Sequence, residues 1–396
     1  MATEQSSSPR NETPRLLLFG VTKLSDMIAK GNLRYVDGYR SYFGSVDVAY
    51  LVGHSQSQVS QAGTHLVSLG SGNMAIDLIL APVNLYRFAR KNPADVYLTA
   101  DQVFSWWTAL LIRWLLGARV VLMPVALPEQ LYVDHDVSLS GLPVWVEKIM
   151  LRLSFASASV VHTAHAFGAF VEIFRAHPYS RDKVFITDGL VEALPGPEFE
   201  AARLLLRDRD RRHLATPIRL IYVGRLHPEK LVEDLIEMMQ RMQAKCGDRS
   251  VRLRLIGDGP DRTRLEALAT SLGVDSSVDF VGSKSNGDIP EELFAADMIV
   301  SPLTGTSLRE AALCGLPIVA YERDWIVGVL KNNETALLVP SRDVGGLSDA
   351  VLRLIADDGL RVKLSQNVKV LGETLWTIEG ARRAMSELHA AVARTK

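Results

Sequence analysis

Cysteine, net charge and long uninterrupted apolar runs are all scarce in this sequence of 396 residues. Its two cysteines, Cys246 and Cys314, make no disulfide framework or metal cluster, and such scarcity fits a reducing compartment. We expect both to be buried small hydrophobic residues. The formal net charge of -1 lacks the basic excess that a nucleic-acid-binding protein needs, so we expect no nucleic-acid partner.

We expect neither a membrane span nor a signal peptide. The most apolar stretch, Val103 to Leu127, is interrupted by two arginines and a glycine, which indicates a buried helix followed by a strand. The polar N-terminus, 1–15, has no apolar core, so we predict that it is disordered and that the protein is cytoplasmic. Peripheral contact with the inner membrane face, through the apolar segment Phe104 to Leu116, stays open.

The chain is too long for one ordinary core, so two domains are expected. Short apolar segments alternate with helical spacing in both halves, which is typical of parallel sheets covered by helices on both faces. We predict an α/β fold of two Rossmann-like, doubly wound domains. The expected parts are an N-terminal domain at 16–192, a charged linker with a short helix at 193–217, a C-terminal domain at 218–372, and a C-terminal helix at 373–396 that packs back toward the N-terminal domain.

Short apolar runs predict the strands. Those of the first half are Leu16 to Phe19, Val46 to Val52, His65 to Leu69, Val96 to Thr99, Arg119 to Met123, Ser159 to His162 and Lys183 to Thr187. Those of the second half are Arg219 to Val223, Arg252 to Ile256, Val278 to Val281, Met298 to Val300, Ile318 to Tyr321 and Leu337 to Val339.

One segment of the first half supports a rival function. Gly70 to Ala75, GSGNMA, matches the G-x-G-x-x-A dinucleotide fingerprint between a predicted strand and a predicted helix. The acidic ribose partner is expected about twenty residues further on, whereas Asp95 precedes its strand and Asp101 comes later than that. At least two strands also precede the match. A dinucleotide-dependent oxidoreductase is therefore the weaker alternative.

The first strand of the second half ends in a positively charged loop. After Val223 the chain reads GRLHPEK, in which Gly224 permits a tight turn while Arg225 and Lys230 follow the carboxyl end of the strand. Arginine grips phosphate oxygens through two parallel bonds and lysine adds a mobile point charge. This pair therefore predicts an anion site.

The stretch from Ala296 to Trp325 supplies the second part of that site. It reads as a strand, a small-residue loop, a short helix ending near Gly315 and a second strand, which together form one βαβ unit. Ser307 to Glu310, SLRE, has the pattern of a capping box. Because this helix starts at the carboxyl edge of the sheet, its free amides and its dipole favour a phosphate there.

These motifs follow one another in an order that resembles a known family. The segments GRLHPEK, LRLIGDGPDRTRLEALATSLGV, VDFVG, EELFAADMIVSP, LREAALCGLPIVAYERDW and ETALLVPSRD resemble the C-terminal domain of family four glycosyltransferases, the glycosyl transferases group 1. The resemblance is close over residues 218–356 and fainter in the first half. It implies the GT-B architecture, with two Rossmann-like domains facing a central cleft, and a retaining mechanism. It also implies that the domain at 16–192 binds the acceptor and that the domain at 218–372 binds the nucleotide sugar.

The resemblance also implies roles for particular residues. Arg225 and Lys230 match the pair that holds the nucleotide diphosphate, and Glu310 matches the second glutamate of the family's E-x7-E motif, which bonds the ribose hydroxyls. His135 and His162 are candidates for the histidine near the sugar. The remaining donor contacts are expected from the sheet edge and the start of the helix, at Gly224, Gly257, Gly282, Ser283, Ser307 and Leu308.

The sequence departs from the family where the donor sugar binds. Eight residues before Glu310 the family places another glutamate, and in this chain that position is Pro302. Contacts to the sugar must therefore be made differently. Thr304, Gly305 and Thr306 are the substitutes that we expect.

The resemblance implies a retaining glycosyltransferase that moves a sugar from a nucleotide-diphosphate donor, with UDP or GDP as the nucleotide, to an acceptor hydroxyl. The acceptor would be a glycan, a glycolipid or a polysaccharide precursor, bound as such or linked to a lipid. We expect no metal and no cofactor beyond the nucleotide sugar itself. The main alternative is a nucleotide-sugar-binding protein with weak or no catalysis, because Pro302 replaces the sugar-contacting glutamate.

Overall fold

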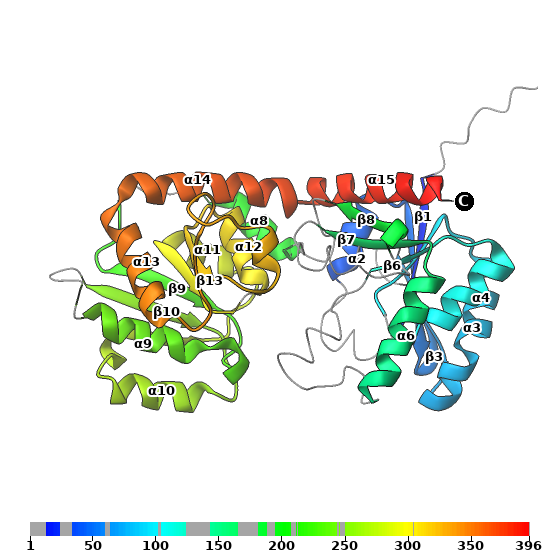
Figure 1. The fold of residues 1–396 in the computed structure, drawn as a ribbon, viewed down its shortest axis with the longest axis horizontal. Helices are drawn as coiled ribbons and strands as arrows, with labels where there is room; N and C mark the ends of the chain where they lie inside the picture. Colours follow the sequence, from blue (N-terminus) through cyan, green and yellow to red (C-terminus); the bar gives the residue numbers. More distant parts are fainter. Residues whose placement is uncertain are drawn as a thin grey trace, which may run out of the picture. The chain divides into compact units, whose positions relative to one another are not determined.

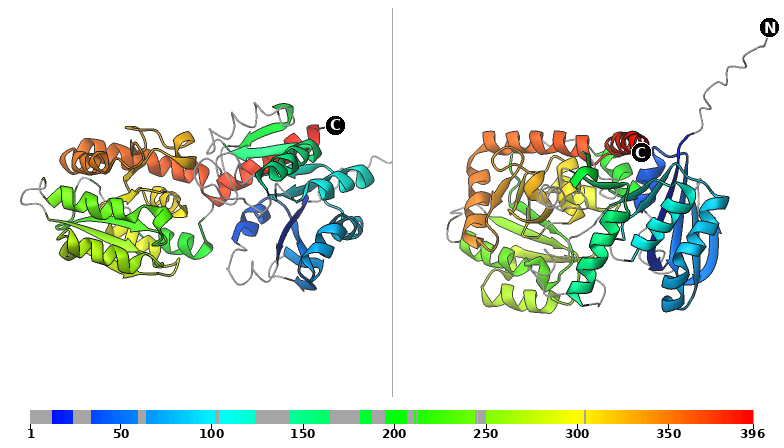
Figure 2. Two further views of the ribbon diagram at one scale, coloured as in Figure 1. Left: turned by 60° about the horizontal axis from the view of Figure 1, so that its bottom comes forward. Right: turned by 45° about the vertical axis from the view of Figure 1, so that its right-hand side comes forward.

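The protein folds into two α/β units, each built around its own sheet (Figure 1). In this computed structural model the described residues are 13–23, 34–59, 64–101, 104–123, 143–164, 181–187, 195–206, 211, 213–243, 245, 250–303 and 305–395. Unit 1 comprises Met1–Thr163, Ile173–Thr187 and Arg382–Lys396, and unit 2 comprises Ala164–Glu172 and Asp188–Ala381. Figure 2 shows both units from two further directions.

Within the described residues of unit 1, sheet A has the strand order β3-β4-β2-β1-β5-β6-β7-β8. The strands are β1 (Arg15–Lys23), β2 (Ser45–Val52), β3 (His54–Val59), β4 (Thr64–Ser71), β5 (Val96–Thr99), β6 (Val120–Leu122), β7 (Val160–Ala164) and β8 (Val184–Thr187). β3 pairs antiparallel with β4, whereas β1 pairs in parallel with both of its neighbours, β2 and β5. Sheet A is therefore a doubly wound sheet with one reversed edge strand.

Three helices of unit 1 lie side by side: α3 (Met74–Lys91), α4 (Trp106–Leu116) and α6 (Val144–Ser157). α4 contacts both of the others, and Figure 1 shows the three as one layer. A further helix, α2 (Arg34–Arg40), precedes β2. The last helix, α15 (Ile378–Arg394), returns to unit 1, where Arg382 donates to the carbonyl of Ser41 at 2.9 Å.

Sheet B of unit 2 has the order β11-β10-β9-β12-β13-β14 and is parallel throughout. Its strands are β9 (Ile218–Val223), β10 (Val251–Ile256), β11 (Val278–Gly282), β12 (Met298–Ser301), β13 (Ile318–Tyr321) and β14 (Leu337–Val339). Its helices are α8 (Pro197–Leu205), α9 (Val232–Gln243), α10 (Arg262–Ser271), α11 (Ile289–Ala295), α12 (Thr306–Leu313), α13 (Val344–Ala356) and α14 (Asp358–Leu375).

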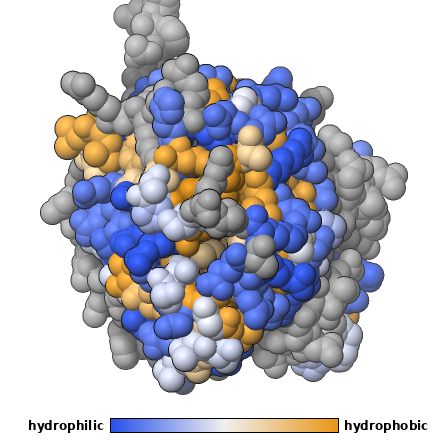
Figure 3. Space-filling model, turned by 90° about the vertical axis from the view of Figure 1, so that its left-hand side faces the viewer, coloured by the Kyte–Doolittle hydropathy of each residue, from blue (hydrophilic) through white to orange (hydrophobic). Residues whose placement is uncertain are grey.

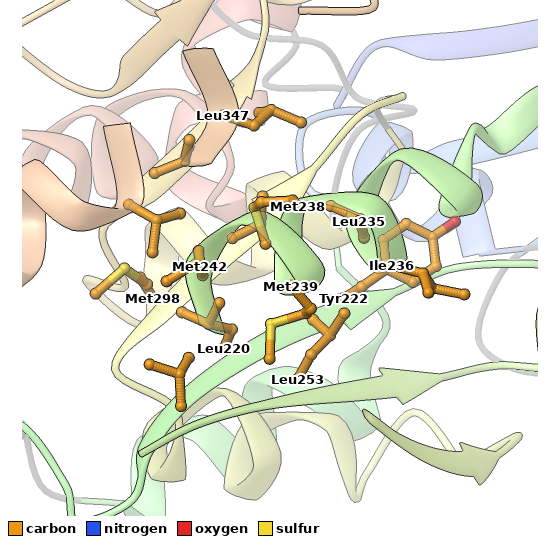
Figure 4. Packing of buried hydrophobic residues seen from close by; sticks show 14 of the residues in the cluster. Leu220, Tyr222, Leu235, Ile236, Met238, Met239, Met242, Leu253, Met298 and Leu347 are labelled. Atoms are coloured by element: carbon orange, nitrogen blue, oxygen red, sulfur yellow. The ribbon is translucent and has the colours of Figure 1, made fainter. Parts of the chain in front are cut away.

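The residues of β9 alternate between two hydrophobic clusters, one on each face of sheet B. Leu220 and Tyr222 belong to the cluster in Figure 4, where they pack with the methionine-rich side of α9. Ile221 points to the opposite cluster, which contains residues of α11, α12 and α14. Burial on both faces explains why the strands of this domain read as continuous apolar runs. On the face of the molecule drawn in Figure 3, hydrophilic and hydrophobic residues are intermixed.

Most predicted strands lie within one or two residues of the observed ones, and the two doubly wound domains are confirmed. α2 and β3 were not predicted. The prediction that the helix after Val103 is buried is wrong for one of its faces, because Leu110 and Trp114 of α4 are 52% and 81% exposed. No described helix has both the length and the apolar character that crossing a membrane requires.

The segment expected to be a linker, 193–217, contains α8. Phe199 of this helix is fully buried and packs in one cluster with Leu293 of α11. Asp297 fixes the end of the segment and is itself only 2% exposed. Its carboxylate accepts hydrogen bonds from the amides of Ala215 at 3.1 Å and Arg219 at 2.8 Å. A buried carboxylate thus fixes the entry into β9.

We predict that Asp297→Ala lowers the free energy of unfolding by about 2 to 3 kcal/mol, because two amides lose a charged acceptor in a buried place. Urea unfolding followed by circular dichroism measures this change. The exposed Asp275→Ala serves as control and should change stability by less than about 0.5 kcal/mol. Equal effects of the two substitutions would contradict the assigned role of Asp297.

Candidate functional site

Three glycines join the carboxyl ends of β9, β10 and β11. The amide of Gly224 donates to the carbonyl of Ile256, and the amide of Gly257 donates to the carbonyl of Gly282, each at 2.9 Å. Gly257 has a φ of 139°, and a Cβ on it would lie 1.8 Å from the carbonyl oxygen of Gly224. Only glycine permits this approach of the two chains. Three of the predicted site residues therefore meet at one edge of sheet B.

The charged loop follows directly from this junction. Leu226 donates to the carbonyl of Asp258 at 3.0 Å, which anchors the loop, and a turn of 3-10 helix, Pro228–Lys230, follows. The guanidinium of Arg225 lies 2.8 Å from Oε1 of Glu229, and Nζ of Lys230 lies 3.9 Å from the same oxygen. Two cations thus face a single carboxylate oxygen, Arg225 at hydrogen-bond distance and Lys230 at the longer range of an ion pair.

The position of this loop in the sheet is as important as its charge. From β9 the chain runs to β10 and β11 on one side, and later places β12 on the other side of β9. The strand order therefore reverses between β9 and β12. In open α/β sheets, ligands bind outside the carboxyl ends of the strands at such a switch point. The Arg225 loop leaves β9 at this point, and the start of α12 follows β12 beside it.

α12 begins two residues earlier than the capping box predicts. Its N-cap is Gly305, an extended residue with no side chain to cap the helix, and Thr306 is the first helical residue. Ser307 is buried inside the first turn, so the predicted capping box is wrong: a residue at that position cannot act as N-cap. Gly305 and Thr306 are exposed at the helix start, where the dipole favours an anion.

The other predicted donor contacts have different surroundings. Leu308 is fully buried and Glu310 is 9% exposed, one turn into α12. Ser283 is exposed just after Gly282, whose φ of 85° turns the chain at the end of β11. Thr304 lies outside the described residues. Pro302, at the position where the resemblance implies a glutamate, is buried directly after β12.

His162 is a core residue rather than an accessible one. It has no exposed surface; its Nε2 hydrogen-bonds to Oγ1 of Thr187 at 2.9 Å, and its Nδ1 lies 3.3 Å from the sulfur of Met123. Burial lowers the pKa of His162 to about 4, so the ring is neutral near pH 7. A catalytic histidine has to reach its substrate, and the expected role of His162 therefore has no support here. His135 lies outside the described residues.

The fingerprint at Gly70 to Ala75 does form a strand, turn and helix, but its amides are already occupied. The carboxylate of Asp77 accepts from the amides of Gly53, Ser71 and Gly72. Burial opposes ionisation of Asp77, yet the hydrogen bond from the Ser71 hydroxyl and the bonds from these amides outweigh it and lower its pKa. A pyrophosphate would have to displace this carboxylate. β4 also lies away from the switch point of sheet A, which is between β1 and β5. The geometry argues against the dinucleotide alternative.

Glu229 was not singled out from the sequence, although it contacts both cations of the loop. The sequence signal was its position four residues after Arg225, because oppositely charged side chains at this spacing can form an ion pair within a helical turn.

Cys314, predicted to be buried, is 2% exposed, and burial raises the pKa of its thiol to about 12. Cys246 lies outside the described residues. Those residues contain no group of three or more His, Cys, Asp or Glu side chains that could hold a metal ion.

The two doubly wound sheets, with a cationic loop at a switch point, define the GT-B architecture, and comparisons with solved structures agree. A sucrose-phosphate synthase from Thermosynechococcus elongatus has a TM-score of 0.67 at 17% identity, covering 97% of this chain and 100% of that one. A Rickettsia africae glycosyltransferase has a TM-score of 0.69 at 15% identity, covering 97% and 100%. The Anabaena protein HepE, solved with UDP and glucose, has a TM-score of 0.63 at 15% identity, covering 95% and 99%.

At the level of sequence, residues 207–370 match the family described as Glycosyl transferases group 1. Alpha-D-kanosaminyltransferase from Streptomyces kanamyceticus is 30% identical over 46% of this chain and 47% of its own length. D-inositol 3-phosphate glycosyltransferase from Salinispora arenicola is 31% identical over 40% of this chain and 39% of its own length. The matches thus span less than half of these curated relatives.

The buried ring of His162 predicts a pH dependence of stability. Its pKa is about 4 in the folded protein against an ordinary value of 6.5, so the unfolded chain binds the extra proton between these values. Stability from this residue is complete above pH 6.5 and is lost as the pH falls toward 4, by about 3 kcal/mol in total. Urea unfolding across this range should show a smaller slope for His162→Asn; equal slopes would contradict the assignment.

Proposed function

We propose that the protein is a retaining glycosyltransferase that uses a nucleotide-diphosphate sugar bound at the carboxyl edge of sheet B. The observation that carries this proposal is the convergence of Arg225 and Lys230 on one oxygen of Glu229, at the switch point beside the start of α12. The group 1 domain at residues 207–370 contains all of these elements, which supports the same conclusion.

In this proposal the diphosphate takes the position that faces both cations. Its departure from the sugar leaves an oxocarbenium-like centre and a developing negative charge on the leaving group. Arg225, Lys230 and the first amides of α12 are held in place before the reaction, so they stabilise this charge with little reorganisation. These groups can supply the required charge themselves, and we propose that no metal cofactor is needed. The leaving phosphate would help to deprotonate the acceptor on the same face, which retains the anomeric configuration.

The rest of the donor is assigned by position along the sheet edge. Glu310, one turn into α12, would accept bonds from the ribose hydroxyls. Gly282 and Ser283, at the end of β11, would contact the base through the backbone. Gly305 and Thr306 would contact the sugar, together with Thr304. UDP is the first nucleotide to test, because HepE was solved with it; GDP is the second. The proposed acceptor is a hydroxyl of a glycan or a lipid-linked precursor.

A second candidate function is nucleotide-sugar binding without transfer, and Pro302 favours it. A buried proline cannot supply the charged contact that a glutamate would make to the sugar. Incubation with UDP-, GDP- and ADP-sugars, followed by measurement of nucleotide release, separates the two candidates. Release that increases with a glycan acceptor supports transfer. Tight binding of a nucleotide sugar without nucleotide release, even with lipid-linked and oligosaccharide acceptors, would contradict the proposal that the protein is an enzyme.

We predict that Arg225→Ala weakens binding of UDP or GDP by about tenfold or more, because a charge-assisted bond to the diphosphate is lost. Isothermal titration of the purified protein measures the affinity. Arg252→Ala is the matched control: Arg252 belongs to the same sheet but lies near the opposite, amino end of β10, in an exposed pair with Asp279. Unchanged affinity in Arg225→Ala would refute the site.

Glu229→Gln should have the opposite effect. The Glu229 carboxylate competes with the diphosphate for both cations, so its neutralisation should strengthen nucleotide binding. Exposed ion pairs are worth about 0.2 to 1 kcal/mol, which allows a gain of up to about fivefold. Glu334→Gln, which removes an exposed partner of Lys331 elsewhere in unit 2, should leave the affinity unchanged. Weaker binding in Glu229→Gln would show that Glu229 holds the loop in shape instead.

A further inference from the structure

Unit 2 has an open groove near the amino ends of its strands, at the end of sheet B opposite to the candidate nucleotide site. We call it the arginine groove. Arg219 of β9 and Arg252 and Arg254 of β10 line it from the sheet, and Glu292 and Ala295 line it from α11. Its volume is about 460 Å³. Pockets for small organic ligands measure about 300 to 1,000 Å³, so the groove has room for such a molecule.

The strand periodicity brings the three arginines to one face of sheet B. Arg252 and Arg254 are two residues apart on β10, and Arg219 of β9 is the register partner of Arg252. Neighbouring strands lie about 4.8 Å apart, so Arg219 and Arg252 leave the sheet side by side. Like charges directly opposite each other destabilise a sheet. An anion bound between these two guanidinium groups would remove the repulsion.

The acidic residue on α11 neutralises only the far end of the groove. Arg254 donates two hydrogen bonds to the carboxylate of Glu292, at 3.0 and 3.2 Å. Nζ of Lys284 lies 2.6 Å from the same carboxylate. Burial opposes ionisation of Glu292, yet the bonds from Lys284 and Arg254 outweigh it and lower its pKa. Glu292 is therefore charged near pH 7 and already paired.

The other end of the groove keeps an excess of positive charge. Arg252 shares the carboxylate of Asp279, at 3.3 Å, with Arg254, at 3.8 Å. Within the part of the chain that the structure describes, the exposed guanidinium of Arg219 has no hydrogen bond and no ion pair. With Lys284 included, four cations thus meet two carboxylates. The excess of two positive charges lies mainly at Arg219 and Arg252.

We propose that the arginine groove binds a small molecule that carries a phosphate monoester. Arginine holds two phosphate oxygens at once through parallel N–H bonds. A phosphate monoester carries about 1.5 to 2 negative charges near pH 7, which matches the excess at Arg219 and Arg252, whereas a single carboxylate carries only one. Pro217, Ala295 and Ala296 give the groove an apolar wall, against which the carbon skeleton of the ligand packs.

The inference does not depend on the proposed nucleotide site. Arg219 lies near the amino end of β9, whereas Arg225 follows its carboxyl end. A strand rises about 3.3 Å per residue, so the two ends of β9 lie about 17 Å apart. A single small phosphate therefore cannot contact both arginines. Binding in the groove needs no step of chemistry, because the phosphate only replaces water and counter-ions there.

Isothermal titration of the full chain with ribose 5-phosphate tests the proposal, with ribose as the uncharged comparison. We expect ribose 5-phosphate to bind and ribose not to bind. Arg219→Ala should weaken binding by roughly tenfold or more, because charge-assisted hydrogen bonds to the phosphate are lost. The matched control is Arg353→Ala, which removes an exposed arginine of α13 that donates to Asn333. This control should bind ribose 5-phosphate as the unmodified protein does.

Two further measurements separate binding in the groove from other effects. Without ligand, Arg219→Ala should leave the free energy of unfolding unchanged, because its guanidinium has no partner to lose, so weaker binding would not reflect a folding defect. Arg225→Ala should keep the affinity for ribose 5-phosphate. Binding that is lost in Arg225→Ala but kept in Arg219→Ala would overturn the proposal in favour of the nucleotide site.

The class of ligand is tested with gluconate, which has one carboxylate and no phosphate. We expect gluconate to bind at least tenfold more weakly than ribose 5-phosphate, because it brings less charge to the two arginines. Equal binding of the two compounds would contradict the assignment to a phosphate monoester. The absence of any binding of ribose 5-phosphate at millimolar concentration would overturn the site itself.

Discussion

The candidate site depends on one close contact between two backbone segments. The carbonyl of Gly224, at the end of β9, occupies the space that a side chain on Gly257, at the end of β10, would fill. A larger residue at Gly257 would meet backbone, which cannot move aside as a side chain can, and it would also need a left-handed conformation. This contact draws the ends of neighbouring strands together, and the loop that carries Arg225 starts from it.

The C-terminal end of the loop that carries Arg225 and Lys230 is also constrained. Leu231, directly after Lys230, has a φ of 54°, which is uncommon for a residue with a side chain. α9 begins at the next residue, and its buried Asp234 accepts bonds from the hydroxyl of Tyr321 and the guanidinium of Arg342, each at 2.7 Å. Burial and then this carboxylate raise the pKa of Tyr321, which keeps its hydroxyl protonated as a donor. Strained backbone persists where the surroundings over-determine it, and this network supplies that constraint.

The sequence predicted unit 2 well because burial on both faces makes each strand a short apolar run, a signal that needs no tertiary information. Gly224, Gly257 and Gly282, and the loop with Arg225 and Lys230, could be predicted as site residues because they directly follow such strands. The capping box was misplaced because Ser307 and Glu310 have the right spacing, whereas the start of α12 depends on Gly305. β3 was missed because HSQSQV has no apolar alternation and pairs only at an edge. The burial of His162 results from tertiary packing, which the residue type alone does not predict.

Pro302 changes the electrostatics of the site as well as its contacts. It lies directly after β12, next to the strand from which the cationic loop leaves. A carboxylate in this buried place would be costly unless it were paired with a cation. With proline there, Glu229 is the carboxylate that contacts both cations in the described structure. In the function proposed above, the affinity for a diphosphate would then depend mainly on how readily one exposed glutamate is displaced, while recognition of the sugar would depend on the exposed start of α12.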